Sequence, residues 1–215
     1  MRDREDGTKG RSQNAMGSAR ITAPNRDDGV EMQTDLVDRA MRGDHDAFAD
    51  LATAAWARLY GTAGLILGDH GSGQEAAQAA LIRAWRDLPT LRDPARFDAW
   101  LYRLLVNACR DEARKRQRGR QREIALDAQE PMASADPFSR LADRDELDRA
   151  FARLTPDQRA ILALVHYRDL TVPEAARAIG TPLGTAKSRL HRALDALRAA
   201  LAAEARPGIE QEMGT

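Results

Sequence analysis

The chain has 215 residues, 43% of them hydrophobic and 31% charged, and its 33 Lys and Arg residues equal its 33 Asp and Glu residues. This length suits one large domain or two small ones, and the zero net charge does not exclude a nucleic-acid partner, because such binding depends on local patches. No apolar run is long enough to span a bilayer, no signal peptide is visible, and the single cysteine, Cys109, cannot form an internal disulfide. We therefore expect a cytoplasmic protein without membrane insertion.

The first part of the chain predicts a tail followed by short helices. Residues 1–33 are polar and have almost no periodic apolar positions, so we interpret them as a disordered tail. Helical spacing of apolar residues starts near Asp35 and stops at Gly43, and Asp44 is placed to cap a second helix.

Two further helices are predicted in this half. Ser72 and Glu75 have the spacing of a capping box, in which two side chains satisfy backbone N–H groups at a helix start, so we expect the third helix to begin there. A long fourth helix is predicted from about Ala95. It carries an apolar stripe and ends in a basic run from Arg110 to Arg122.

The second half begins after an aperiodic, acidic stretch. Residues 119–140 have the composition of a flexible linker. Beyond them, Thr155 with Gln158, and Thr171 with Glu174, form two further capping-box patterns, each at the start of a predicted helix.

The segment from Thr171 to Leu201 predicts a helix-turn-helix. Its first helix is short, Gly180 permits a left-handed turn, and the last helix carries leucines and alanines on one face and donors on the other. An exposed face of hydrogen-bond donors near a helix N-terminus is suited to binding in the major groove of DNA. The alternative interpretation is an amphipathic helix whose charged side chains only keep it in contact with water. The donors on or beside that face are Thr185, Lys187, Ser188, Arg189, His191 and Arg192.

These patterns predict an all-α protein made of two small helical domains, a helical bundle and a helix-turn-helix, joined by a flexible linker. No strand pattern and no internal repeat is present. The expected boundaries are a tail at 1–33, a first domain at 34–118, a linker at 119–140, a second domain at 141–203 and a tail at 204–215.

Segments in both halves of the chain carry a resemblance to one known family. They are Leu154–Arg159, Leu170–Ala175 and Gly180–Ala193 in the C-terminal half, and Leu81–Trp85 and Arg96–Asn107 with Asp111 in the N-terminal half. The first set resembles region 4, and the second set region 2, of the extracytoplasmic-function (ECF) sigma factors of the sigma-70 family. The resemblance covers about Asp35 to Leu201, in the family's order.

The resemblance implies an RNA polymerase sigma factor, a non-enzymatic subunit without cofactor or metal that directs core polymerase to specific promoters. In this family, region 2 binds the clamp helices of the largest polymerase subunit and opens the −10 element. Region 4 binds the −35 element and the flap of the second-largest subunit. An anti-sigma factor is implied as a further partner.

The resemblance also assigns site residues for the −35 element. Positions that face bases or their neighbours are matched by Ser188, His191 and Arg192. Thr185, Lys187 and Arg189 are better placed for phosphates, which position a domain without specifying sequence. Because His191 stands where an aromatic or apolar residue is common, the preferred −35 sequence is expected to differ from the commonest one.

For the −10 element, Asn107 matches the residue that helps to hold a base flipped from the non-template strand, and the loop from Leu88 to Ala95 is expected to complete that pocket. The alternative to DNA binding by the basic run from Arg110 to Arg122 is a solvated helix end without a partner. The other residues assigned to −10 DNA are Arg92, Arg96, Arg103, Arg110, Arg114 and Lys115.

Four residues are assigned to core polymerase: Glu75, Gln78, Arg83 and Trp85. The family usually has an acidic residue after this glutamine, whereas this chain has Ala79. Glu75 retains a carboxylate one turn earlier.

Two other classes of function fit the sequence less well. An enzyme is disfavoured because the segment Gly68–Gly73 resembles a phosphate loop but lacks the Gly-Lys-Ser/Thr ending, and because the four histidines are scattered without ligand spacing. A repressor or response regulator with the same helix-turn-helix would need a ligand pocket or a receiver domain of alternating strands and helices in the first half.

Overall fold

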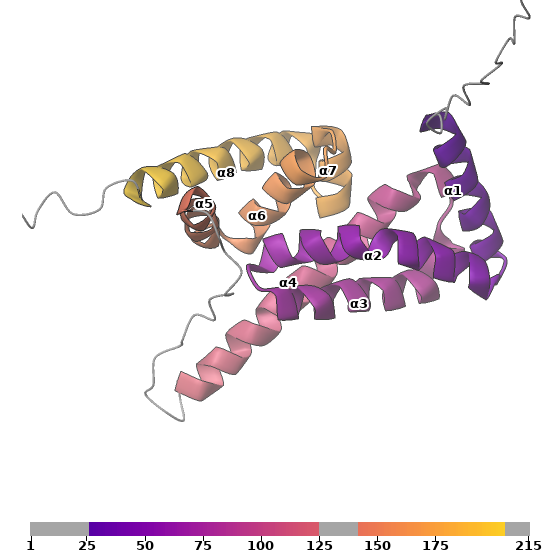
Figure 1. Ribbon diagram of the computed structural model, residues 1–215, viewed down its shortest axis with the longest axis horizontal. Helices are drawn as coiled ribbons and strands as arrows, with labels where there is room; N and C mark the ends of the chain where they lie inside the picture. Colours follow the sequence, from indigo (N-terminus) through magenta and orange to yellow (C-terminus); the bar gives the residue numbers. More distant parts are fainter. Residues whose placement is uncertain (1–25, 125–141, 205–215) are drawn as a thin grey trace, which may run out of the picture.

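The computed structural model describes residues 26–124 and 142–204, and all regular structure in these two ranges is helical (Figure 1). This is the all-α class that the sequence predicts. Since no strand occurs in these ranges, they contain no receiver domain. Most of the predicted linker and much of both predicted tails lie outside the described residues, which end at three gaps, 1–25, 125–141 and 205–215.

The N-terminal group has four α-helices and two short 3-10 turns. The first helix already begins inside the segment interpreted as a tail, and the fourth continues past Gly119, where the linker was expected to start. The elements are α1 (Arg26–Met41), α2 (His45–Leu67), α3 (His70–Asp87), η1 (Leu88–Thr90), η2 (Pro94–Arg96) and α4 (Phe97–Ile124).

The ends of α2 follow from local chemistry. Asp44 caps its start as predicted, with Oδ1 accepting a 3.0 Å hydrogen bond from the Ala47 N–H. Gly68 ends the helix in the left-handed conformation, at φ 67°.

The start of α3 differs from the predicted capping box at Ser72. Asp69 is the N-cap, and its Oδ2 accepts a 2.8 Å hydrogen bond from the Ser72 N–H. Ser72 and Gly73 are buried inside the first turn, and a Cβ on Gly73 would stand 2.8 Å from the backbone nitrogen of Gly64 in α2. The prediction was wrong because an aspartate one turn earlier supplies the cap, and the position of Ser72 belongs to a close helix contact.

The C-terminal group contains the predicted helix-turn-helix. Both predicted capping boxes are present, Thr155 with Gln158 and Thr171 with Glu174, and Gly180 has the left-handed φ of 73° that the turn requires. The elements are α5 (Ala142–Ala152), α6 (Pro156–Leu162), the single π turn η3 (Ala163–Tyr167), α7 (Val172–Ile179) and α8 (Leu183–Glu204).

Small buried side chains set the spacing of the helix-turn-helix. Ala175 and Ala178 of α7, and Ala186 and Ala193 of α8, have no exposed surface. Because a methyl group is the whole side chain at these positions, α7 and α8 approach closely, and α8 also packs along α5 and α6. The opposite face of α8 is left toward solvent.

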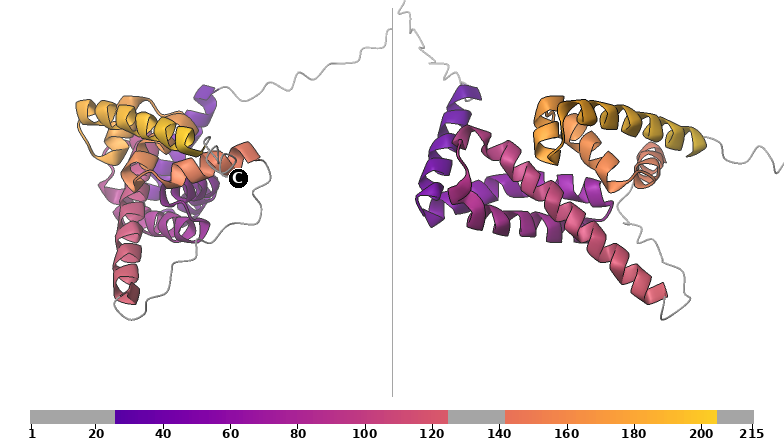
Figure 2. Two further views of the ribbon diagram at one scale, coloured as in Figure 1. Left: turned by 90° about the vertical axis from the view of Figure 1, so that its left-hand side faces the viewer. Right: turned by 180° about the vertical axis from the view of Figure 1, so that it is seen from behind.

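The two helical groups pack directly on each other. α4 lies against α7, and α2 lies against α6 and η3, so the buried apolar residues of both groups form one contiguous cluster. Figures 1 and 2 show the second group seated on α2 and the first half of α4, while the basic end of α4 projects away from the body.

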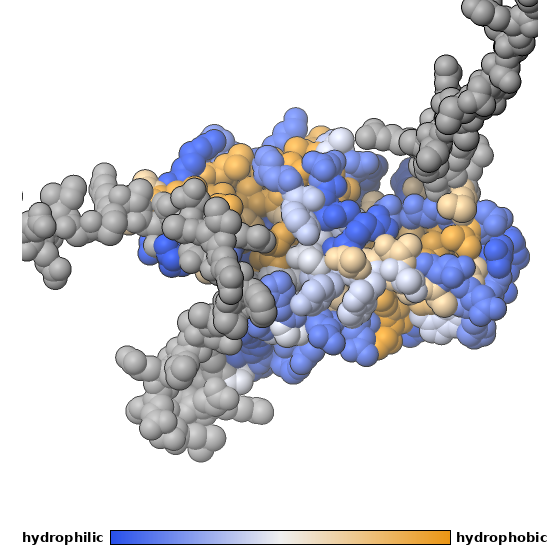
Figure 3. All heavy atoms as spheres, viewed as in Figure 1, coloured by the Kyte–Doolittle hydropathy of each residue, from blue (hydrophilic) through white to orange (hydrophobic). Residues whose placement is uncertain are grey.

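The molecular surface is mainly hydrophilic. The face in Figure 3 carries separate hydrophobic patches, including one over α8 and one over α3. On α3 the large exposed apolar side chains are Ile82 and Trp85. Within the described ranges, no helix combines the length and apolar character needed to cross a bilayer.

Candidate nucleic-acid interface

The loop before α4 and the first turns of this helix form a basic surface. Arg92, Arg96 and Arg103 are exposed, and Asp93 both caps η2 and pairs with Arg96 at 2.8 Å. This surface borders a cleft of about 1030 Å³ between the two helical groups. The arginines that line the cleft come from both groups: Arg58, Arg92, Arg96, Arg103, Arg168 and Arg177.

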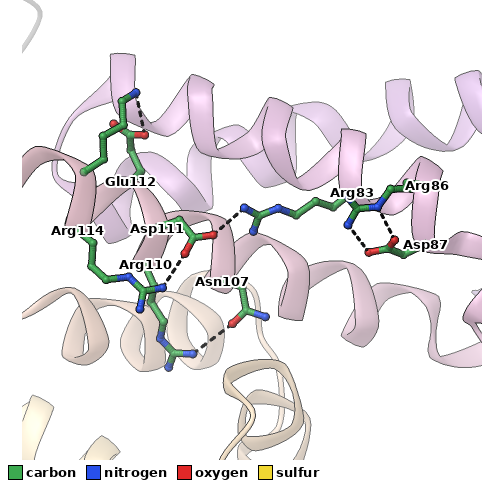
Figure 4. Close-up of polar contacts among 9 residues, drawn as sticks. Arg83, Arg86, Asp87, Asn107, Arg110, Asp111, Glu112 and Arg114 are labelled. Atoms are coloured by element: carbon green, nitrogen blue, oxygen red, sulfur yellow. Dashed lines mark hydrogen bonds and ion pairs between the residues drawn. The ribbon is translucent and has the colours of Figure 1, made fainter.

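Asn107 and Arg110 lie on the same face of α4, one turn apart. The Asn107 side chain is exposed, with Oδ1 3.5 Å from Nη1 of Arg110 (Figure 4). Arg110 is turned toward the second helical group, where Nε donates to Asp157 Oδ1 at 3.1 Å and Nη1 donates to the carbonyl of Ile179 at 3.1 Å. The expected base-holding amide is therefore open to solvent, whereas its basic neighbour is engaged.

Farther along α4, the basic run is paired with acids of α3 and α4. Asp111 accepts 2.6 Å hydrogen bonds from Nη2 of Arg83 and Nη2 of Arg114, and these bonds, that of Arg83 foremost, hold the pKa of Asp111 below its usual value (Figure 4). Lys115 Nζ donates to Glu75 Oε2 at 3.0 Å, a bond that raises the pKa of Lys115. These cations are ordered by carboxylates, which argues against a simply frayed helix end.

The residues assigned to polymerase lie on more than one side of α3: Glu75 and Arg83 bond to residues of α4, whereas Trp85 lies toward the start of α2. Gln78 and Glu75 are exposed, and the half-exposed Trp85 ring packs on His45 and Phe48, with centroids 4.7 and 4.9 Å away. Ala79 lies in a shallow depression that it shares with Glu75 and Asp111. Both of these carboxylates are already bonded to cations, Glu75 to Lys115 and Asp111 to Arg83.

The outer face of α8 presents the predicted donors. Thr185, Lys187, Ser188, His191 and Arg192 are exposed, and Arg189 is half-buried. Arg192 folds along its own helix, with Nε donating to the Ser188 carbonyl at 3.2 Å, and His191 Nε2 lies 3.3 Å from Asp195 Oδ2. Arg189 points elsewhere, with Nη1 3.7 Å from Asp157 Oδ2.

Sequence reasoning missed the contacts at the start of α6. Asp157 faces both Arg110 and Arg189, although its sequence context shows only a first-turn acid within a capping box. Arg159 is 8% exposed, its Nε has no hydrogen-bond partner among the described residues, and burial lowers its pKa. No local signal marks the contacts of Asp157, because Arg110 and Arg189 are far away in the chain.

A further long-range contact joins Tyr102 of α4 to Arg168, the residue that follows η3. The Tyr102 hydroxyl accepts a 2.8 Å hydrogen bond from Nε of Arg168, and burial raises the pKa of this tyrosine. The ring of Tyr167 lies against Gly61 of α2, where a Cβ would stand 2.9 Å from the tyrosine hydroxyl oxygen.

The described residues contain neither a metal-binding cluster nor an accessible thiol. No group of three or more His, Cys, Asp or Glu within them is arranged to hold a metal ion. Cys109 is buried, and burial raises the pKa of its thiol to about 12, so the reactive thiolate is scarce at neutral pH.

Comparison with known proteins identifies the family. Residues 51–119 match the family described as sigma-70 region 2, and residues 144–197 match sigma-70, region 4. The RNA polymerase sigma-H factor of Pseudomonas aeruginosa is 30% identical over 182 residues, which cover 80% of this chain and 94% of the relative. The ECF RNA polymerase sigma factor SigK of Mycobacterium tuberculosis is 31% identical over 169 residues, which cover 76% and 90%. The chain belongs to the sigma-70 family, as an ECF RNA polymerase sigma factor.

Solved structures show the same fold. The chain is similar to CnrH, solved in complex with the cytosolic domain of CnrY, with a TM-score of 0.58 and 24% identity over 80% of this chain and 98% of that one. It is also similar to RpoE of Bartonella quintana, solved with the anti-sigma factor NepR, with a TM-score of 0.58 and 24% identity over 72% and 96%.

Proposed function

We propose that this protein binds core RNA polymerase, directs it to promoters through −35 and −10 elements, and begins DNA melting, without catalytic activity or a cofactor of its own. It acts in the cytoplasm and is restrained there by an anti-sigma factor. The observation that carries the proposal is the exposed donor face of α8, which follows the left-handed turn at Gly180 and leaves its apolar face in the core.

Each surface has a chemical role in this proposal. The donors of α8 enter the major groove of the −35 element, where Arg and Ser side chains bond to base edges. Asn107 pairs with the edge of an extruded base of the −10 element, and the arginines around it hold the strand backbone. α3 supplies an exposed aromatic anchor, Trp85, for the polymerase clamp.

The polymerase contact is tested by binding of labelled full-length protein to purified core enzyme at low salt. Trp85→Ala is expected to weaken binding at least tenfold, as for a central aromatic anchor. Trp56→Ala is the matched control, because Trp56 on α2 is equally exposed, at 37% against 38%. Absence of binding by the unmodified protein, or equal loss in both variants, would overturn the assignment of α3.

A further inference from the structure

His191 lies beside Asp195 on the outer face of α8, one helical turn before it. Its Nε2 atom is 3.3 Å from Oδ2 of Asp195, while the other carboxylate oxygen, Oδ1, accepts a 2.7 Å hydrogen bond from Nη1 of Arg198. The two oxygens of Asp195 therefore face different partners. The His191 side chain is 77% exposed, so most of the ring remains open to a ligand.

The carboxylate influences which nitrogen of the imidazole carries the proton. A neutral imidazole has one N–H and one nitrogen with a lone pair, and the two can exchange places. A lone pair on Nε2 would face the anionic Oδ2 of Asp195 and be repelled, whereas an N–H at the same place is attracted. The contact therefore favours the neutral form of His191 with its proton on Nε2, which leaves Nδ1 as a hydrogen-bond acceptor.

An acceptor at Nδ1 brings a property that the cationic side chains of this face lack. Lys187 and Arg192 only donate hydrogen bonds, because an ammonium and a guanidinium have no acceptor atom. Among the described residues, Nδ1 of His191 has no hydrogen-bond or ion-pair partner. It is therefore an unused acceptor beside cationic donors on the exposed side of α8.

In the major groove of DNA, an acceptor selects bases that present an amino group. Adenine presents N6–H₂ and cytosine presents N4–H₂, whereas O6 of guanine and O4 of thymine are acceptors and would repel a lone pair. The same imidazole with its proton on Nδ1 would have the opposite preference. The position of one proton thus decides which bases His191 can select.

We propose that Asp195 is a positioning residue that fixes the His191 imidazole as an acceptor, so that His191 selects adenine or cytosine at one position of the −35 element. The inference rests on the proposed function, because it takes the outer face of α8 as the face that enters the major groove. Asp195 acts through the imidazole of His191 and not through a contact of its own with DNA.

The test uses core polymerase, the full-length protein and a library of promoters in which every −35 position is varied. Selection is carried out at about pH 8, where imidazole side chains are in general uncharged. The unmodified protein is expected to prefer adenine or cytosine at one position by about threefold or more, as for one hydrogen bond. His191→Ala should abolish the preference at this position and leave the preferences at the other positions in place.

Variants of Asp195 separate positioning from a merely structural role. Asp195→Asn presents an amide that can donate to Nε2 or accept from it, so both proton positions on His191 become accessible, and the preference should disappear or pass to guanine or thymine. Asp195→Glu keeps a carboxylate and should retain the preference. Arg198→Ala, the control, removes only the partner of Oδ1 and should also retain it. A change in helix stability alone would weaken all sequences alike without reordering them.

A second measurement does not depend on the folding of the Asp195 variants. At the position that His191→Ala identifies, the preferred base is replaced by an analogue without the amino group, purine for adenine or 2-pyrimidinone for cytosine. The unmodified protein should lose about threefold in affinity, whereas His191→Ala should lose nothing further, since the hydrogen bond is already absent. Equal losses for the two proteins would overturn the proposal.

The outcome is separable from that of the proposed function. If the polymerase complex selects −35 sequences but His191→Ala changes no preference, or Asp195→Asn leaves the preference unaltered, the positioning of His191 is wrong and the proposed function stands. A preference of the unmodified protein for guanine or thymine at this position would overturn the proposal in the same way. If the complex selects no −35 sequence at all, the proposed function fails and the role of Asp195 fails with it.

Discussion

Arg83 of α3 and Asp111 of α4 are joined by a 2.6 Å hydrogen bond, and the same carboxylate also binds Arg114 at 2.6 Å. The pair links the surface assigned to polymerase with the surface assigned to the melted strand. α3 and α4 are therefore held together here by charge as well as by apolar packing.

This pair gives a pH-dependent prediction. The pKa of Asp111 is lowered in the folded protein, so its stabilising effect is complete above the ordinary pKa of an aspartate and is lost as pH falls through the lowered value. Since the side chains remain partly exposed, Asp111→Asn should lower the free energy of unfolding by about 1 kcal/mol or less at pH 7. Urea unfolding should show this difference shrinking toward pH 3; a difference that grows instead would contradict the assignment.

The close contact of α2 with α3 predicts a stability loss on adding one methyl group. A Cβ on Gly73 would stand 2.8 and 2.9 Å from the backbone nitrogen and Cα of Gly64, so Gly73→Ala should lower the free energy of unfolding by about 1–3 kcal/mol. Gly71→Ala, in the same turn but exposed, is the control and should be neutral or slightly stabilising. Equal thermal unfolding midpoints for the two variants would disprove this account of the contact.

Asn107 is exposed on α4, so its removal should spare the fold and affect DNA opening. We expect Asn107→Ala to reduce permanganate reactivity of the −10 bubble more than it reduces initial duplex binding by the polymerase complex. The reason is that the amide meets a base edge only after the base is extruded. Equal loss of both signals, or an unaffected bubble, would argue against its place in the base pocket.

The positions of Arg192 and Lys187 on α8 predict different roles in DNA binding for these two side chains. Arg192→Ala should relax base preference within the −35 element, because a good bidentate contact to a base contributes about 1–3 kcal/mol of discrimination. Lys187→Ala should weaken all sequences alike and reduce the salt dependence of binding, as loss of a phosphate contact does.

Both variants are measured on a library of −35 sequences at several salt concentrations. Arg198→Ala is the control, because Arg198 is exposed on α8 and bonds to Asp195 at 2.7 Å, away from the helix start. If Lys187→Ala reorders the sequences and Arg192→Ala does not, the roles of the two side chains are exchanged.

The features of this fold that could be predicted from sequence are those set by residues close together in the chain. The caps at Asp44, Thr155 and Thr171 and the turn at Gly180 are set within four or five residues, and all were predicted correctly. The cap at Asp69 was missed because two acceptable capping patterns compete there, and burial at the contact between α2 and α3 decides between them. Sequence alone does not reveal such burial.

The candidate site likewise has some features that the sequence predicts and others that it does not. Exposure of Asn107 and of the α8 donors other than Arg189 follows from helical periodicity and the resemblance, and the structure places these side chains on outer faces. The engagement of Arg110 by Asp157 could not be predicted, because the two residues are 47 positions apart and belong to separate helical groups. Only the packing of α4 on α7 and of α2 on α6 brings them together.

The central claim, that this chain gives core polymerase its promoter specificity, is tested most directly by transcription in vitro on fragmented genomic DNA, with core enzyme alone and with core enzyme plus this protein. Sequencing of transcript 5′ ends should show start sites that appear only with the protein and share two upstream motifs, and Arg192→Ala should alter the motif farther upstream. Start sites that are identical with and without the protein would contradict the claim.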